Sequence, residues 1–176
     1  MNTNKQKITR ISKTLDAVMK IGGFALIAMV VAMIVLAVVA PSLDLTSFKI
    51  TGMWSNTAFS GGVDDFRSLM ILEILNGGVV AAMLFLAGGI FRDMSREHTP
   101  FTKKNVTRLR IISPLLIVFG VVVPPLASLI SLIFAPAVDL FFSLNIGYLV
   151  FAAMFFCLAL VFEYGAELQN QADETL

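Results

Sequence analysis

Charged residues are scarce in this chain, and their scarcity excludes an ordinary water-soluble domain. Asp, Glu, Lys and Arg make up 14% of the 176 residues, whereas hydrophobic residues make up 57%. Soluble domains carry about 25% charged residues. Too few charged side chains remain to cover a surface that faces water, and the mean hydropathy is +0.86. The composition therefore indicates a protein whose main solvent is the lipid bilayer.

Cysteine and histidine are rarer still, since Cys157 and His98 are the single residues of their types. One cysteine rules out an internal disulfide, and a Cys/His zinc site needs about four ligands. The glycine pairs that begin at residues 22, 61, 77 and 88 belong to no nucleotide-binding pattern. We therefore expect no catalytic site, no metal site and no cofactor, and we predict that the protein is not an enzyme.

Four long apolar runs dominate the sequence. Crossing the hydrocarbon core takes about 20 apolar residues in a helix. The runs predict membrane spans at about residues 17–40, 68–92, 106–136 and 140–163. A cleaved signal peptide is disfavoured because its apolar region would be only about 7–15 residues long. The predicted fold is a single all-α integral membrane domain, residues 1–176, that forms a four-transmembrane-helix bundle.

Basic residues predict how this bundle is oriented. Five Lys and Arg residues lie within the first 20 positions and six lie between positions 92 and 110, whereas the first outer loop holds two and the second holds none. Basic flanks stay in the cytoplasm. The expected topology is therefore N-in/C-in, with an outer loop at 41–67, a cytoplasmic loop at 93–105 and a cytoplasmic tail at 164–176.

Two flanking segments allow more than one interpretation. Ile8, Ile11, Leu15 and Val18 follow helical spacing among basic residues, which predicts an amphipathic helix lying on the inner membrane surface. A plain basic flank that only sets topology is the alternative. In the outer loop, residues 48–56 carry a weak signal for a short β-hairpin, although aromatic residues there usually lie at the level of the lipid headgroups.

The second span carries small residues on one face. Gly77, Ala81 and Gly88 share this face with Glu73 and Leu84. Small residues four positions apart let helix backbones approach closely, and positions that face lipid have no need of them. This face is therefore predicted to point into the bundle.

Three features inside the spans suggest a second kind of function. Glu73 is the only charged residue within an apolar run, and Asn76 lies beside it. An intramembrane carboxylate is a functional hypothesis by default. A structural role, with Glu73 reaching the headgroups or pairing with a neighbour, is the favoured alternative. Pro124-Pro125 predicts a kink or break in the third span.

Two polar segments on the expected cytoplasmic side are distinctive. Residues 99–110 read Thr-Pro-Phe-Thr-Lys-Lys-Asn-Val-Thr-Arg-Leu-Arg, and Thr102 is a suitable cap for the helix that follows. If the fourth helix continues into the tail, Tyr164, Leu168, Ala172 and Leu176 line one face of an acidic helix. Such a helix would dock on the basic loop or on a soluble partner. A frayed, solvated terminus is the alternative.

These segments resemble the bacterial membrane family described as domain of unknown function 2975. The first motif is matched by Pro100, Phe101, Thr102, Asn105, Arg108, Leu109 and Arg110, although His98-Thr99 stands where the family usually has a glycine. The tail motif is matched by Phe162, Tyr164, Gly165, Leu168, Gln169, Asp173, Thr175 and Leu176. The resemblance implies a multi-pass protein of the bacterial cytoplasmic (inner) membrane. It also implies a partnership with a small helix-turn-helix transcription regulator, because such genes often neighbour those of the family.

The leading hypothesis is a non-enzymatic membrane protein that binds a cytoplasmic partner and contacts lipid, but not nucleic acid directly. The residues predicted to bind the partner are Thr102, Asn105, Arg108, Arg110, Tyr164, Gly165, Leu168, Gln169 and Asp173. A small transporter or channel subunit is the runner-up. It would use Glu73, Asn76 and the Pro124-Pro125 break, and it would need to form a homo-oligomer. An immunity or stress-tolerance protein is a third possibility.

Overall fold

The computed structural model describes residues 3–39, 63–134 and 146–174, and this part of the chain is helical apart from one short connection. The elements are α1 (Thr3–Val39), α2 (Val63–Glu97), α3 (Lys103–Ile117), the π-helical turn η3 (Val118–Val122), α4 (Val123–Phe134) and α5 (Ile146–Glu174). The residues proposed for a β-hairpin, 48–56, lie outside the described ranges. Four helical rods, with α3, η3 and α4 forming one of them, are long and apolar enough to cross a membrane. The predicted all-α, four-helix membrane class is therefore confirmed.

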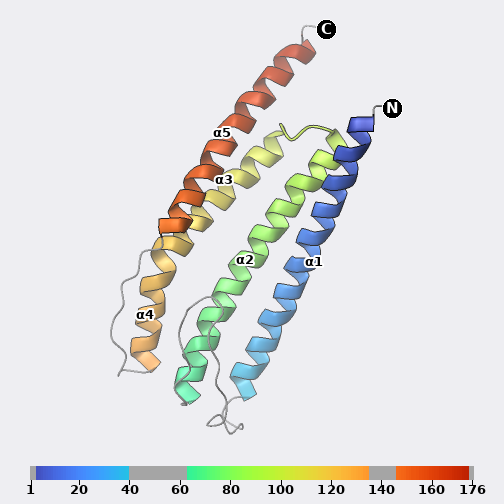
Figure 1. Cartoon of the computed structure of the whole chain (residues 1–176). Helices are drawn as coiled ribbons and strands as arrows, with labels where there is room; N and C mark the ends of the chain where they lie inside the picture. Colours follow the sequence, from blue (N-terminus) through green and yellow to red (C-terminus); the bar gives the residue numbers. More distant parts are fainter. Residues whose placement is uncertain (1–2, 40–62, 135–145, 175–176) are drawn as a thin grey trace.

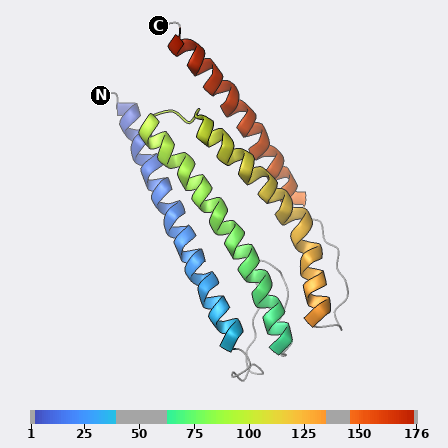
Figure 2. The same cartoon turned by 180° about the vertical axis from the view of Figure 1, so that it is seen from behind.

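The helices pack in chain order as an open row. α1 lies along α2, α2 contacts α3 and α4, and α3 packs against α5 (Figures 1 and 2). Both chain ends and the connection between α2 and α3 lie at the same end of the molecule, which we call the terminal end (Figure 1). Because α1 and α5 stand at the two sides of the row, large apolar side chains such as Phe24 and Val161 are exposed on them. Such faces suit contact with lipid.

The interface between α1 and α2 is built on small residues, as the sequence predicted. Gly77 and Ala81 of α2 are buried, and an added Cβ on Gly77 would lie 2.9 Å from the side chain of Val30 in α1. From the α1 side, a Cβ on Gly23 would meet the ring of Phe85 at the same 2.9 Å. The two helices therefore touch at distances that leave no room for larger side chains.

The first helix runs without interruption through the basic N-terminal segment. At about 1.5 Å per residue, the 37 residues of α1 extend about 55 Å, well beyond the hydrocarbon thickness. Met19 and Asp16 pack against Gly88 of α2, and Ser12 is only 1% exposed. The hypothesis of a helix lying flat on the membrane is therefore wrong, because this segment continues the span and stands against α2.

The third rod bends where its prolines lie, but it does not break. Pro124 and Pro125 cannot donate the backbone N–H bonds of a regular helix. Directly before them the chain widens into the π-helical turn η3, in which the Val123 N–H donates to the Val118 carbonyl. One extra residue in the turn redirects the rod while keeping it helical, and Figure 1 shows the bend between α3 and α4.

The helices extend past the apolar runs. α2 begins at Val63 within the predicted outer loop, and of the predicted cytoplasmic loop at 93–105 only residues 98–102 are non-helical. Thr102 caps α3 as expected, since its hydroxyl accepts a hydrogen bond of 3.2 Å from the Asn105 N–H. α5 likewise continues to Glu174 through the predicted tail, so that the polar ends of three helices are ordered together.

Candidate functional site

The connection at residues 98–102 joins α2 to α3 and also contacts α1 and α5 at the terminal end. Its His98 lies 3.3 Å from the Thr9 hydroxyl on α1 and adopts a left-handed backbone conformation with φ of 55°. The Thr99 hydroxyl donates to the Gln169 side chain on α5 over 3.1 Å. Five residues thus link the first helix of the row to the last.

Gly165 in the tail leaves room for the ring of Phe101. An added Cβ on Gly165 would lie 2.6 Å from the Phe101 ring, so only glycine leaves this space. The same ring meets Phe162 edge-on, with centroids 5.5 Å apart. The loop and tail motifs noted in the sequence are therefore in direct contact with each other.

A buried polar cluster joins α2 to α3 beneath this loop. Arg108 Nη1 donates to Asp93 Oδ2 over 2.6 Å and to the side-chain oxygen Oδ1 of Asn105 over 2.8 Å. The Asn105 amide in turn donates to the Pro100 carbonyl, and Asn105 is fully buried. Gly89 leaves room for the guanidinium, since a Cβ there would lie 2.8 Å from it. The charges are therefore held in one geometry by three helical positions and the loop.

Sequence analysis missed Asp93 in this cluster. Asp93 was treated only as the first residue of a basic loop. It directly follows the apolar run and Arg92, so it is an acid at the start of a basic segment. An acid that opens a basic segment is a signal for an internal ion pair, but its partner fifteen residues away depends on how α2 and α3 pack.

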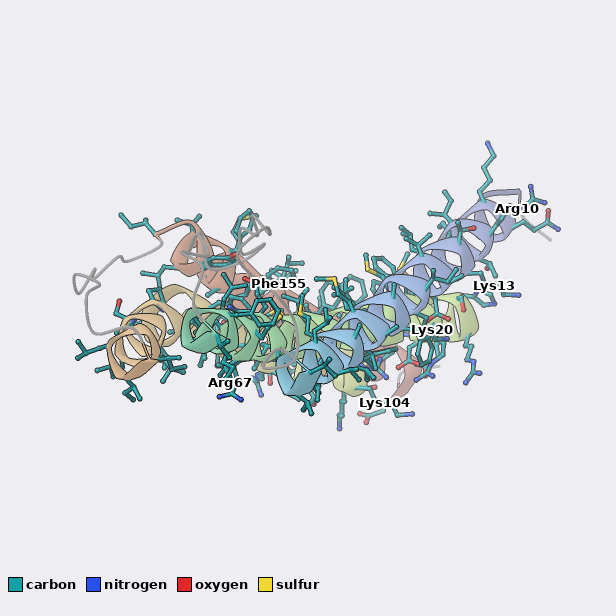
Figure 3. All side chains as sticks on the ribbon, turned by 90° about the horizontal axis from the view of Figure 1, so that it is seen from below. Arg10, Lys13, Lys20, Arg67, Lys104 and Phe155 are labelled. Atoms are coloured by element: carbon teal, nitrogen blue, oxygen red, sulfur yellow. The ribbon has the colours of Figure 1, made fainter. Side chains whose placement is uncertain are left out.

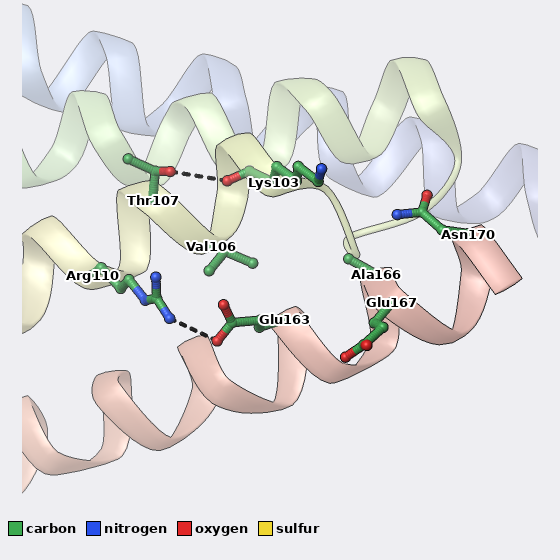
Figure 4. A pocket seen from close by; sticks show the side chains of 8 residues that line it. All are labelled: Lys103, Val106, Thr107, Arg110, Glu163, Ala166, Glu167 and Asn170. Atoms are coloured by element: carbon green, nitrogen blue, oxygen red, sulfur yellow. Dashed lines mark hydrogen bonds and ion pairs between the residues drawn. The ribbon is translucent and has the colours of Figure 1, made fainter.

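A polar groove runs between α3 and α5 at the terminal end (Figure 4). Its volume is about 440 Å³, and it is lined by Lys103, Val106, Thr107, Arg110, Glu163, Ala166, Glu167 and Asn170. An ion pair of 2.7 Å between Arg110 and Glu163 crosses one end, and both side chains are 50% exposed. The groove therefore has charged walls that solvent or a ligand can reach.

The structure sorts the residues predicted to bind a partner into two sets. Most of them contact other parts of the chain: Thr102, Asn105, Arg108, Arg110, Gly165 and Gln169. Tyr164 and Leu168 are instead exposed, at 65% and 47%. The side chain of Asp173 lies outside the described part of the chain. The contacts bring the two predicted segments together, and they leave one face of α5 open.

The polar residues predicted inside the membrane lie far from the polar cluster at the terminal end. Glu73 and Asn76 are each 2% exposed and lie one turn apart on α2. Twenty residues, or about 30 Å of helix, separate Glu73 from Asp93. Within the described residues, no group of three or more His, Cys, Asp or Glu side chains is placed to hold a metal ion.

We define the terminal platform as residues 90–110 together with 162–174. It comprises the end of α2, the connection, the start of α3 and the end of α5, where charged and polar residues replace most of the apolar ones. No protein-family model, curated protein or solved structure matches this chain. Fold and site together define a class, namely a multi-pass membrane protein with four membrane-crossing helices and an ordered polar platform at one end.

Proposed function

We propose that this chain is a non-enzymatic protein of the bacterial cytoplasmic membrane that holds a soluble protein at the membrane surface through the terminal platform. The proposed orientation has both termini in the cytoplasm. It is supported by the distribution of Lys and Arg in the sequence, with eleven within positions 1–20 and 92–110 and two, Lys49 and Arg67, between the first two apolar runs. Figure 3 shows Arg10 and Lys13 projecting from the far end of α1.

The observation that carries the proposal is that the tail forms an ordered helix packed against the loop between α2 and α3. α5 continues twelve residues from Glu163 to Glu174, or about 18 Å, beyond the apolar run that ends at Phe162. One side of it rests on Thr99 and Phe101. The other side exposes Tyr164 and Leu168, which are neighbours on the helix surface. Exposed apolar residues on an ordered polar helix mark a protein-binding face.

The chemistry of this face indicates what it would bind. Tyr164 and Leu168 provide apolar anchors, and Glu163, Glu167 and Glu174 place acidic groups on the same helix. A complementary partner has an apolar groove with a basic rim, as a helix-in-groove complex requires. A helix-turn-helix regulator, which the family resemblance implies, carries basic surface for DNA.

The local conformation of His98 supports the family resemblance. The related motif usually has glycine before Pro-Phe, and here His98 adopts a left-handed conformation that glycine adopts without strain. Histidine is one of the non-glycine residues enriched in this region of backbone space. Contacts between the two motifs also give a physical reason for their occurrence together, since Phe101 of one rests on Gly165 of the other.

A double variant tests the proposal. Tyr164→Ser with Leu168→Ser removes the apolar anchors while leaving the Phe101 and Gln169 contacts intact. When the chain is produced together with a small helix-turn-helix regulator, the regulator should sediment with membranes. It should move to the soluble fraction with the double variant, but not with the control Lys13→Ala, whose exposed side chain lies on α1 outside the terminal platform. Equal membrane retention with both variants, or none with the unmodified chain, would contradict the proposal.

A small transporter or channel subunit is a second candidate, favoured by the burial of Glu73 and Asn76 inside a span. Polar groups at such depth commonly line ion pathways. Ion flux into proteoliposomes that disappears with Glu73→Gln would support this candidate. The absence of flux for protons, sodium and potassium would count against it.

A further inference from the structure

The groove between α3 and α5 lies at the level where the hydrocarbon region ends. Gly88 of α2 faces Met19 of α1, and Gly89 faces Arg108 of α3, so these positions share one level. Arg110 pairs with Glu163 at the start of the polar part of α5. On the membrane side of this level the described rods are apolar except for Glu73 and the charged start of α2, and on the other side all four carry charges. The groove therefore opens beside the lipid headgroups.

The two walls of the groove carry opposite charges. Lys103 and Arg110 stand on the α3 wall, and Glu163 and Glu167 stand on the α5 wall, so that the groove has no net charge (Figure 4). Within the described residues, neither Lys103 nor Glu167 forms an ion pair, and both are exposed. A ligand with both a negative and a positive group and no net charge is complementary to these walls.

An apolar surface continues the groove toward the membrane. On α5, Phe156 and Leu160 follow the face of Glu163 and Glu167 at helical spacing, and they are 52% and 47% exposed. On α3, Ile117 lies two turns below Arg110 on the same face and is 44% exposed. Acyl chains packed along these side chains would leave their headgroup at the groove.

We propose that this groove binds a phospholipid whose headgroup ends in a primary ammonium, that is, phosphatidylethanolamine. Arg110 binds the phosphate, because only one of its five N–H donors is needed for the bond to Glu163. Glu167, about 6 Å further from the hydrocarbon than Glu163, binds the ammonium. Because Arg110 of α3 pairs with Glu163, it lies nearer the hydrocarbon than Glu167, and this order matches a headgroup whose phosphate lies nearest the acyl chains.

The same geometry disfavours the other common headgroups. A choline group has no N–H to donate to Glu167 and is bulkier than an ammonium. Phosphatidylglycerol carries the same phosphate but no ammonium, so Glu167 would stay without a cation and the groove would gain a net negative charge. A soluble peptide would have to reach a groove that opens at the hydrocarbon boundary. The site therefore selects its lipid through the acidic wall as well as the basic one.

Native mass spectrometry tests the assignment. The whole chain is extracted into detergent from vesicles that contain equal amounts of phosphatidylethanolamine, phosphatidylcholine and phosphatidylglycerol, and the lipids retained on it are counted. Phosphatidylethanolamine should be retained about tenfold more than either of the others, the difference expected from one hydrogen-bonded charge pair. Equal retention of the three lipids, or a preference for phosphatidylglycerol, would overturn the proposal.

Two variants and one control test separately how the ammonium and the phosphate of the headgroup are bound. Glu167→Gln should reduce the retention of phosphatidylethanolamine to the level of phosphatidylcholine, whereas Arg110→Gln should lower the retention of both, since both carry a phosphate. Glu174→Gln makes the same charge change on α5 outside the groove and should have no effect. An unchanged preference in Glu167→Gln would also overturn the proposal. The vesicles contain no other protein, so the outcome is independent of the proposed soluble partner.

Discussion

The α1–α2 interface and the interfaces around α3 are held together in different ways. α1 and α2 meet through glycine and aliphatic contacts, such as Gly77 against Val30. α3 is joined to α2 by the ion pair between Arg108 and Asp93, and to α5 by the bond from the Ser113 hydroxyl to the Ala152 carbonyl. The first interface depends on shape, and the others depend on specific polar partners.

This difference shows which helix interfaces respond to ligands, salt and substitutions. Lipid tails are as apolar as the helices, so small-residue packing associates α1 with α2 through close contact alone. A polar bond near the headgroups responds to ligands, salt and substitutions at either partner. Both sequence motifs lie in the half of the molecule whose helices are joined by polar bonds. Because such bonds respond to a ligand or a change of salt, this half suits a binding surface.

The largest effect is expected from breaking the buried ion pair. Arg108→Met removes the 2.6 Å partner of Asp93, whose side chain is 10% exposed, and leaves it the longer 4.0 Å contact with Arg92, so the fold should be destabilised by about 3 kcal/mol. Thermal unfolding in detergent micelles followed by circular dichroism measures this loss. The double variant Asp93→Asn with Arg108→Met should recover most of the stability, and if it is as unstable as the single variant, the charge explanation fails.

An intermediate effect is expected from enlarging a glycine in the α1–α2 interface. Gly77→Leu forces new atoms against Val30 and should destabilise the fold by about 1–3 kcal/mol, independently of salt. Gly78 is the matched control because a Cβ there meets no atom within 4 Å, so Gly78→Leu should be tolerated. Equal unfolding temperatures for the two variants would show that shape does not hold this interface together.

The smallest effect is expected from the exposed ion pair at the groove. Glu163→Gln removes a bond whose two side chains are 50% exposed, and it should change the stability by less than about 1 kcal/mol. The difference from the unmodified chain should vanish at high salt, because exposed pairs are screened. A loss of stability that persists in molar salt would contradict this prediction. It would mean that the Arg110–Glu163 pair is shielded from solvent, as the Arg108–Asp93 pair is.

Local sequence signals predicted several features that the structure confirms. The four apolar runs, the cap at Thr102 and the inward small-residue face of α2 each depend on residues within a few turns of one another. The Pro124-Pro125 pair likewise predicted a bend, because a proline affects only its own turn. The extension of helices beyond the apolar runs was harder to predict, since composition marks the membrane boundary and not the end of a helix.

The sequence by itself determined the class, four apolar helices long enough to cross a membrane, because hydrophobicity and helix length act locally. It also supplied two polar motifs, yet it left their relation to each other open. Only the tertiary structure decided that Phe101 rests on Gly165, that Arg108 pairs with Asp93, and that α3 and α5 enclose a charged groove. These contacts join residues up to 64 positions apart, and they depend on how far each helix is shifted and rotated against its neighbour. That register is set by the packing of whole faces, which no single segment of the sequence specifies.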